Sequence, residues 1–326
     1  MDCKDIKNTI VLKNFRLQKI FPLKNETEGG GYMITLFQEF QHIIKVNEPL
    51  SSHSTMRVGG PAALAAFPTN RAELSALIQG AKAQNIRHII VGNASNILFS
   101  DRGFDGLAIF TTAMRNVVWN GASVTADCGA SLTALSAAAT KRGLSGLEFA
   151  FGIPGTIGGA VYMNAGAYGS QISAVLTGSE YLTRDNAILT RNAREHKFGY
   201  RTSIYRSTDD IILSAEFTLT PGDPEAISAK AKQNMDSRRS KQPLEYPNAG
   251  SVFKRPDGAF PGALIEQAGL KGFRIGGAEF SEKHANFIVN RGGATADDIL
   301  RLTETAQKTV YKQFGISLET EIIYIS

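Results

Sequence analysis

Apolar positions spaced three and four residues apart predict four helices along the chain. In the first, residues 70–85, Asn70 occupies the N-cap position and Glu73 follows three residues later, the spacing of a capping box. Helices are also expected after Ser131, from Pro224 to about Arg239, and after Thr295. Gly143 and Gly315 are expected to end the second and the fourth helix, because glycine adopts the left-handed conformation of a helix C-terminus at little cost.

Short apolar or alternating runs between these helices predict β-strands. They fall at residues 87–91, 97–99, 107–110, 117–119, 123–126, 187–189, 211–218 and 318–325. The segment 251–292 is mixed and rich in turns, and no internal repeat is evident. Helices and strands alternating in this way predict an α/β or α+β protein.

Residues 1–32 differ from the rest of the chain. They are rich in Lys and Asn, end in Glu28-Gly29-Gly30-Gly31, and precede a second methionine, Met33. We expect them to be a disordered extension or the product of an upstream start codon, and we assign them no functional role.

Composition narrows the class of protein. With 326 residues, 43% of them hydrophobic, the chain can bury the cores of two or three domains. Its two cysteines, Cys3 and Cys128, form no disulfide framework and no metal-ligand pattern, which indicates a reducing compartment and no metal site. No signal peptide or membrane span is recognisable. A cytoplasmic protein is therefore expected.

The net charge of +5 leaves two kinds of partner open, a nucleic acid and an anionic small substrate. The basic residues are dispersed and not interleaved with aromatic ones, which disfavours a nucleic acid.

The densest glycine region indicates a ligand site. Phe151–Gly169 contains Gly152, Gly155, Gly158 and Gly159 and carries no Lys, Arg, Asp or Glu. Glycine lets backbone N–H groups approach a diphosphate or a flavin ring. The region matches neither a Rossmann fingerprint nor a P-loop. A second turn of small polar residues, Gly92–Asn96, has the same character and alone is weak evidence.

Seven blocks together resemble the UDP-N-acetylenolpyruvoylglucosamine reductases, in that family's shorter second type. The resemblance runs from about residue 38 to the end of the chain. The blocks are Thr55-Met56-Arg57-Val58-Gly59-Gly60-Pro61-Ala62, Gly92-Asn93-Ala94-Ser95-Asn96, Gly152–Ala160, Tyr162–Gly169, Gly199-Tyr200-Arg201-Thr202-Ser203, Gly250-Ser251-Val252-Phe253-Lys254 and Leu318-Glu319-Thr320-Glu321.

The resemblance implies an α+β fold with a two-part FAD-binding domain of the vanillyl-alcohol-oxidase type and a smaller α+β substrate-binding domain. On this chain the first would span residues 33–220, with its two subdomains divided near residue 103. The second would span 221–326 after the joint Pro221-Gly222-Asp223-Pro224, its last strand returning toward the flavin.

The resemblance also implies the activity. NADPH would reduce non-covalently bound FAD, which would then reduce the enolpyruvyl ether of a UDP-N-acetylglucosamine derivative, a step of peptidoglycan synthesis. The expected protein is a monomer that binds neither nucleic acid nor membrane.

The expected cofactor-binding residues lie in the two glycine-rich stretches: Gly92, Asn93, Ala94, Ser95, Asn96, Gly155, Thr156, Gly158, Gly159, Ala160, Asn164, Ala165 and Gly166. Ala94 stands where the family commonly has glycine. If this position requires a positive φ, alanine costs roughly 1 kcal/mol or more there.

The resemblance implies three residues that act on the substrate. Arg201 would hold its carboxylate, Ser251 would donate the proton, and Glu321 would assist in proton donation or hold Arg201. On a strand Glu321 would share a face with Ile323 and Ile325, and an inward carboxyl usually has a raised pKa or a charged partner. The expected substrate-binding residues are Tyr162, Tyr200, Arg238, Lys241, Arg255 and His284.

The closest alternative is an oxidase of the same flavin fold. Many such oxidases attach FAD covalently through His or Cys, but none of the five histidines lies in a recognisable attachment block.

Overall fold

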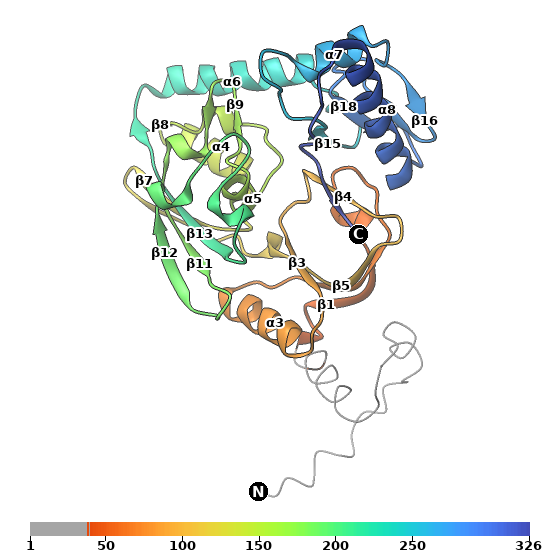
Figure 1. Cartoon of the computed structure of the whole chain (residues 1–326). Coiled ribbons are helices and arrows are strands. Elements are labelled where there is room, and N and C mark those ends of the chain that lie inside the picture. The colour runs from red at the N-terminus through yellow and green to blue at the C-terminus, as the bar shows by residue number, and fades with distance from the viewer. Residues whose placement is uncertain (1–37, 39) are drawn as a thin grey trace, which may run out of the picture.

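Three larger β-sheets, one in each of three parts, form the framework of the described residues, and three two-stranded sheets accompany them (Figure 1). The computed structural model describes Gln38 and residues 40–326. The expected extension 1–32 and the domain start at Met33 lie outside the described residues.

The first part is a four-stranded sheet with one helix on its face. Its order is β1 (Ile44–Pro49), β2 (Pro61–Ala66), β5 (Phe104–Phe110) and β3 (His88–Val91). Side chains on β5 alternate between the two faces: Leu107 and Ile109 join the cluster that contains α3 (Arg71–Ala83), while Ala108 and Phe110 join a cluster on the other side. The predicted cap is present, since Asn70 accepts the backbone N–H of Glu73.

The second part is a five-stranded antiparallel sheet. Its order is β12 (Ile188–Asn192), β11 (Leu176–Leu182), β13 (Ile211–Thr218), β7 (Ser123–Asp127) and β6 (Val117–Asn120). The short α5 (Ile157–Tyr162) packs against β7 and β13, and α4 (Leu132–Lys141) begins at the predicted cap Ser131. Two small ribbons complete this part: β9 (Gly166–Ala167) with β10 (Ser170–Gln171), and β8 (Leu144–Ser145) with β14 (Thr220–Pro221).

The third part is a four-stranded antiparallel sheet with helices α7 (Pro261–Gln267) and α8 (Ala296–Phe314). Its order is β15 (Asn248–Ser251), β18 (Phe287–Asn290), β17 (Ala278–Phe280) and β16 (Arg274–Ile275). The predicted ends of α8 are confirmed: Thr295 forms a capping box with Asp298, and Gly315 closes the helix at φ 70°.

Helix α6 (Pro224–Lys241) leads toward the third part and packs on the second (Figure 1). Its Asn234 donates a hydrogen bond to the carbonyl of Glu148, 2.9 Å away. Likewise β5 hydrogen-bonds to β2 and β3, so the first sheet extends to Phe110. The first sheet therefore continues past the expected division near residue 103, and α6, which begins at the last residue of the expected joint 221–224, packs on the second part.

The end of the chain returns to the first part. β19 (Ile323–Ile325) pairs in parallel with β4 (Ile97–Phe99). The predicted strand at 318–325 is therefore too long. The extended chain changes partner along its length, because Thr320 bridges to Phe253 before Ile323 pairs with Ile97. Helix α5 was missed altogether, since its two glycines disfavour a helix.

Within residues 40–326, no helix is both long and apolar enough to cross a membrane.

Candidate active site

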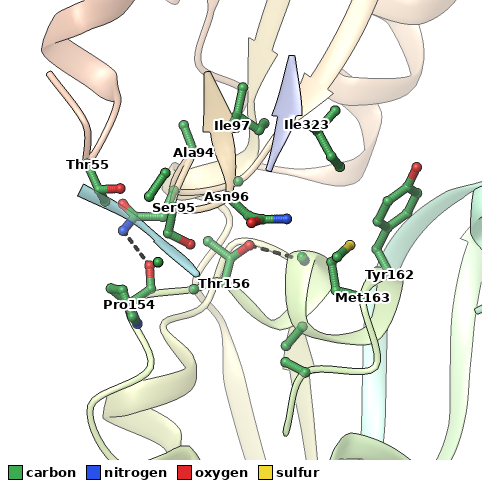
Figure 2. A pocket seen from close by; sticks show the side chains of 18 of the residues that line it. Thr55, Ala94, Ser95, Asn96, Ile97, Pro154, Thr156, Tyr162, Met163 and Ile323 are labelled. Carbon is green, nitrogen blue, oxygen red and sulfur yellow. Dashed lines mark hydrogen bonds between the residues drawn. The ribbon is translucent and has the colours of Figure 1, made fainter. Parts of the chain in front are cut away.

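A cavity of about 1800 Å³ lies where the three parts meet. Both glycine-rich stretches line it, with α6, β15 and β19. Eight Lys or Arg side chains line it against four Asp or Glu, a balance that suits a ligand carrying several negative charges. Figure 2 shows Ser95 and Asn96 facing Thr156, with Ile97 and Ile323 beside them.

The turn 92–96 presents unused backbone donors to this cavity. Among the hydrogen bonds of the described residues, none uses the backbone N–H of Asn93, Ala94 or Ser95. Consecutive free N–H groups form a concave site for phosphate oxygens. The turn is held by Asn93, whose side chain donates to the carbonyl of Pro154, 2.7 Å away.

The second glycine stretch has the shape that a cofactor needs. Thr156 caps α5 by accepting the N–H of Gly159. A Cβ on Gly92 would collide with Oγ1 of Thr156, so this glycine lets the two stretches touch. At Gly155 and Gly159, which line the cavity, a Cβ would meet no neighbour closer than 3.4 Å, so these glycines leave room for a ligand. The volume, the free donors and this open wall fit FAD.

Ala94 is buried and has a positive φ of 45°, the backbone conformation in which alanine is expected to be less favourable than glycine. We expect Ala94→Gly to raise the free energy of unfolding by about 0.5 kcal/mol. Relief of the left-handed backbone contributes roughly 1–2 kcal/mol, and loss of a buried methyl costs about 0.8 kcal/mol. Urea unfolding of the two proteins measures the difference.

The matched control for this prediction is Ala108→Gly. Ala108 is equally buried, lies within β5 and has no positive φ, so its replacement should lower stability by about 1 kcal/mol or more. A loss of stability in Ala94→Gly as large as in Ala108→Gly would show that residue 94 is not strained.

An ion pair joins the second part of the protein to the C-terminal segment. Nε of Arg201 lies 2.7 Å from Oε1 of Glu321, and its Nη2 donates to the carbonyl of Gly166 at 3.2 Å. Burial raises the pKa of Glu321, and the charge and hydrogen bond of Arg201 partly offset that rise. Glu321 therefore has both properties expected from the sequence, an inward carboxyl with a raised pKa and a charged partner.

The hydroxyl of Ser251 has no hydrogen-bond partner among the described residues, although Ser251 lines the cavity. Its position follows from Gly250, which has φ 77° and donates its N–H to the side chain of Asn248. A free hydroxyl on the wall of a cavity is available to a bound substrate.

A second cavity of about 410 Å³ adjoins the first. It is lined by Tyr200 and Arg255, and four residues line both cavities: Arg201, Ser251, His284 and Glu321. The phenol oxygen of Tyr200 accepts the backbone N–H of Arg255 at 3.3 Å. His284 accepts the N–H of Asn286 on Nδ1, and burial lowers its pKa, so the ring stays neutral near pH 7.

Arg238 is a buried cation, and among the described residues no acidic side chain forms an ion pair with it and its Nε has no hydrogen-bond partner. Only 8% of it is exposed, and its Nη1 donates to Gln242 at 2.9 Å. Burial lowers its pKa. Lys241 lines the same cavity, while Arg239 is exposed and lines neither cavity. An uncompensated buried charge favours an anionic ligand.

One expected cofactor residue does not reach either cavity. Asn164 is fully buried and lies at φ 42°. Its side chain donates to the carbonyl of Gly199 and accepts the N–H of Ser173, both at 3.0 Å. Asn164 therefore supports the loop that carries Arg201. Of the other expected site residues, all line one cavity or both.

Several cavity residues were missed from the sequence. Arg57 and Tyr168 lie inside the recognised blocks and have positive φ values of 56° and 54°. Unfavourable backbone conformations concentrate at functional sites, but a sequence does not reveal them in non-glycine residues. Lys82, Arg115 and Arg184 also line the cavity, and no motif marks them.

Two family profiles match the chain. The FAD binding domain matches residues 62–191, and the C-terminal domain of UDP-N-acetylenolpyruvoylglucosamine reductase matches residues 242–325.

Curated relatives cover most of the chain. A UDP-N-acetylenolpyruvoylglucosamine reductase of Lactobacillus johnsonii is 52% identical over 281 residues, which are 86% of this chain and 93% of the relative. That of Streptococcus thermophilus is 46% identical over 279 residues, 86% of this chain and 92% of the relative. Among solved structures, the reductase from Thermus caldophilus superposes with a TM-score of 0.75 at 32% identity, covering 87% of this chain and 98% of that one.

Proposed function

The chain belongs to the UDP-N-acetylenolpyruvoylglucosamine reductase family, and from that premise we propose a role for each group in its central cavity. It is a flavin-dependent oxidoreductase that reduces UDP-N-acetylglucosamine enolpyruvate to UDP-N-acetylmuramate in peptidoglycan synthesis, with NADPH as the hydride donor. Its fold is the α+β arrangement expected from the sequence.

The cofactor is FAD, which when bound would supply the hydride transfer from NADPH to the terminal carbon of the enolpyruvyl double bond. The residues proposed to hold it are the free N–H groups of the turn 92–96 and the open wall made by Gly155, Gly159 and their neighbours. We propose non-covalent binding. Burial raises the pKa of Cys128, which lines the cavity, to about 12, so this thiol stays protonated and is a poor nucleophile.

Arg201 is proposed to hold the substrate carboxylate. Hydride addition at the terminal carbon places negative charge on the carboxylate side of the substrate, as in an enolate. A fixed guanidinium near that charge stabilises it more than it stabilises the neutral double bond. The contacts of Arg201 with Glu321 and Gly166 hold the guanidinium in place before substrate arrives.

Ser251 is proposed to donate the proton to the carbon next to the carboxylate. Its unpartnered hydroxyl lies at the junction of the two cavities. A serine hydroxyl is a weak acid in water, so it needs an adjacent carbanion and a route for its own reprotonation.

Glu321 is proposed to assist that transfer. Its raised pKa keeps a proton available closer to neutrality than an exposed glutamate would, and its bond to Arg201 fixes its direction.

The substrate diphosphate is proposed to bind the cations around the two cavities. Arg238 and Lys241 serve the large cavity and Arg255 the small one, with Tyr162, Tyr200 and His284 as further contacts. The buried guanidinium of Arg238 gives this proposal its strongest support.

The proposal rests on the meeting of three distant residues at one place. Arg201, Ser251 and Glu321 are 50 or more residues apart in the sequence, yet all three line both cavities.

The test is a visible spectrum followed by an NADPH oxidation assay. We expect flavin bands, release of the flavin on acid precipitation, and NADPH oxidation that requires the enolpyruvyl substrate. Oxygen consumption without that substrate would instead indicate an oxidase, and a colourless protein that FAD cannot reconstitute would contradict the cofactor assignment.

The monomeric state and the cytoplasmic location expected from the sequence remain part of the proposal. Light scattering after size-exclusion chromatography should give about 35.1 kDa.

A further inference from the structure

Asn96 makes a contact that separates it from the rest of its turn. Its side-chain Nδ2 donates to the backbone carbonyl of Glu321 at 3.0 Å, and its own carbonyl accepts the N–H of Ile323 at 3.0 Å. Asn96 thus holds the chain on both sides of Ile322, through its side-chain amide on one side and its backbone carbonyl on the other. Its neighbours Asn93, Ala94 and Ser95 leave their backbone N–H groups free toward the cavity.

The same short segment is also held by the two residues that follow Ser251 in the chain. The N–H of Glu321 donates to the carbonyl of Val252 at 2.8 Å, and Thr320 bridges to Phe253. Both backbone polar groups of Glu321 are therefore used, one toward the cofactor turn and one toward Ser251. Its side chain then has the direction that brings Oε1 to Arg201.

We propose that Asn96 is a positioning residue, which sets the place of the Glu321 carboxyl from the cofactor-binding turn. The inference rests on the proposed role of Glu321. It assigns to Asn96 a task other than binding phosphate. The carbonyl oxygen of Glu321 needs a hydrogen-bond donor, which the amide of asparagine supplies and the carboxylate of aspartate does not.

The contact also links binding of the cofactor to the position of the Glu321 side chain. Ile97 and Ile323 line the large cavity from neighbouring strands, so a ligand in that cavity rests on the pair of strands that Asn96 joins (Figure 2). Occupation of the cofactor site should therefore favour the arrangement in which Glu321 faces Arg201.

The test is a double-mutant cycle in the full-length holoenzyme, saturated with FAD. We expect Asn96→Ala to slow reoxidation of the reduced flavin by the enolpyruvyl substrate about tenfold, because displacement of a catalytic group by a fraction of an ångström costs rate steeply. In the Glu321→Gln background the same change should slow reoxidation by less than about twofold, since Asn96 would act through the carboxyl already removed.

Asn93→Ala is the matched control. It removes an asparagine from the same turn whose amide also donates to a backbone carbonyl, but that carbonyl belongs to Pro154 and not to Glu321. Its effect should be the same in both backgrounds. If Asn96→Ala does not retain FAD, the near-isosteric Asn96→Asp replaces it, with the same expected cycle.

Two outcomes separate the possible failures. If Glu321→Gln slows reoxidation and Asn96→Ala slows it equally in both backgrounds, Asn96 acts through the cofactor and the inference is wrong. If Glu321→Gln alone leaves reoxidation unchanged, the proposed role of Glu321 is wrong, and the inference fails with it.

Discussion

Replacing Ser251 by alanine should slow reoxidation of reduced FAD by the enolpyruvyl substrate about 1000-fold, within the range of 10²–10⁴ that a positioned proton donor contributes. Reduction of FAD by NADPH needs no proton from Ser251 and should stay within about threefold of the wild-type rate. The hydroxyl has no hydrogen-bond partner among the described residues, so its removal breaks no internal bond. Stopped-flow absorbance at the flavin bands measures the two half-reactions separately.

Ser207→Ala is the control for this experiment. Ser207 is exposed, lines neither cavity, and its hydroxyl bonds only to the carbonyl of Ile204. Both half-reactions should keep their wild-type rates in this variant. Equal slowing of both half-reactions in Ser251→Ala would indicate a damaged site and not a lost proton donor.

Replacing Arg201 by methionine should lower kcat/KM for the enolpyruvyl substrate by about 10²–10³, the cost of removing one fixed donor from a developing negative charge. Methionine keeps much of the side-chain length without the charge. Steady-state kinetics with varied substrate measures the loss. In Arg239→Met, which changes an exposed arginine that lines neither cavity, kcat/KM should stay within about twofold of wild type.

The Arg201→Met substitution should also make the free energy of unfolding depend more strongly on pH. Burial raises the folded-state pKa of Glu321 above its ordinary 4.5, and without Arg201 that pKa should rise further. A raised pKa stabilises the fold below the unfolded value of 4.5, and this contribution is lost as pH rises through the folded value. Arg201→Met should therefore be close to wild type in stability near pH 4.5 and about 2 kcal/mol less stable at pH 8, where a buried carboxylate has lost its hydrogen-bonded partner.

Urea unfolding of both proteins at the two pH values tests this expectation. A deficit of the same size at pH 4.5 and pH 8 would mean that lost packing, and not the unpaired carboxylate, destabilises the variant. The double variant Arg201→Met with Glu321→Gln should recover most of the loss at pH 8, because residue 321 then carries no charge that needs Arg201 as a partner.

Local structure could be predicted from the sequence where a single residue type decides the backbone. The caps Asn70, Ser131 and Thr295 are all confirmed, as is the closing Gly315. In each case a side-chain oxygen or a missing Cβ has a direct effect within one helical turn. At Ala94 the sequence stated only a condition, a cost for alanine if the position requires a positive φ, and the structure supplies that φ.

What the sequence could not show depends on contacts between distant segments. The stretch 318–325 appears as one strand because its apolar pattern is continuous, yet its partners are first Val252 and Phe253 and then β4. Nor does a sequence show that Asn164 faces inward to Gly199 while its neighbour Ala165 lines the cavity. The candidate catalytic residues themselves came from the family resemblance, since spacing alone does not bring Arg201 to Glu321.

The pairing of β19 with β4 has a consequence for how the protein is made. Ile323 follows Ile97 by 226 positions in the chain, so a ribosome adding roughly 5–20 residues per second completes the second strand at least about 10 s after the first. During that interval the edge of β4 has no neighbour from β19, and one wall of the large cavity is absent. Unpaired strand edges attract other extended chains. The nascent protein therefore passes through a period in which its central site is open and prone to aggregation, and synthesis of a three-residue strand ends it.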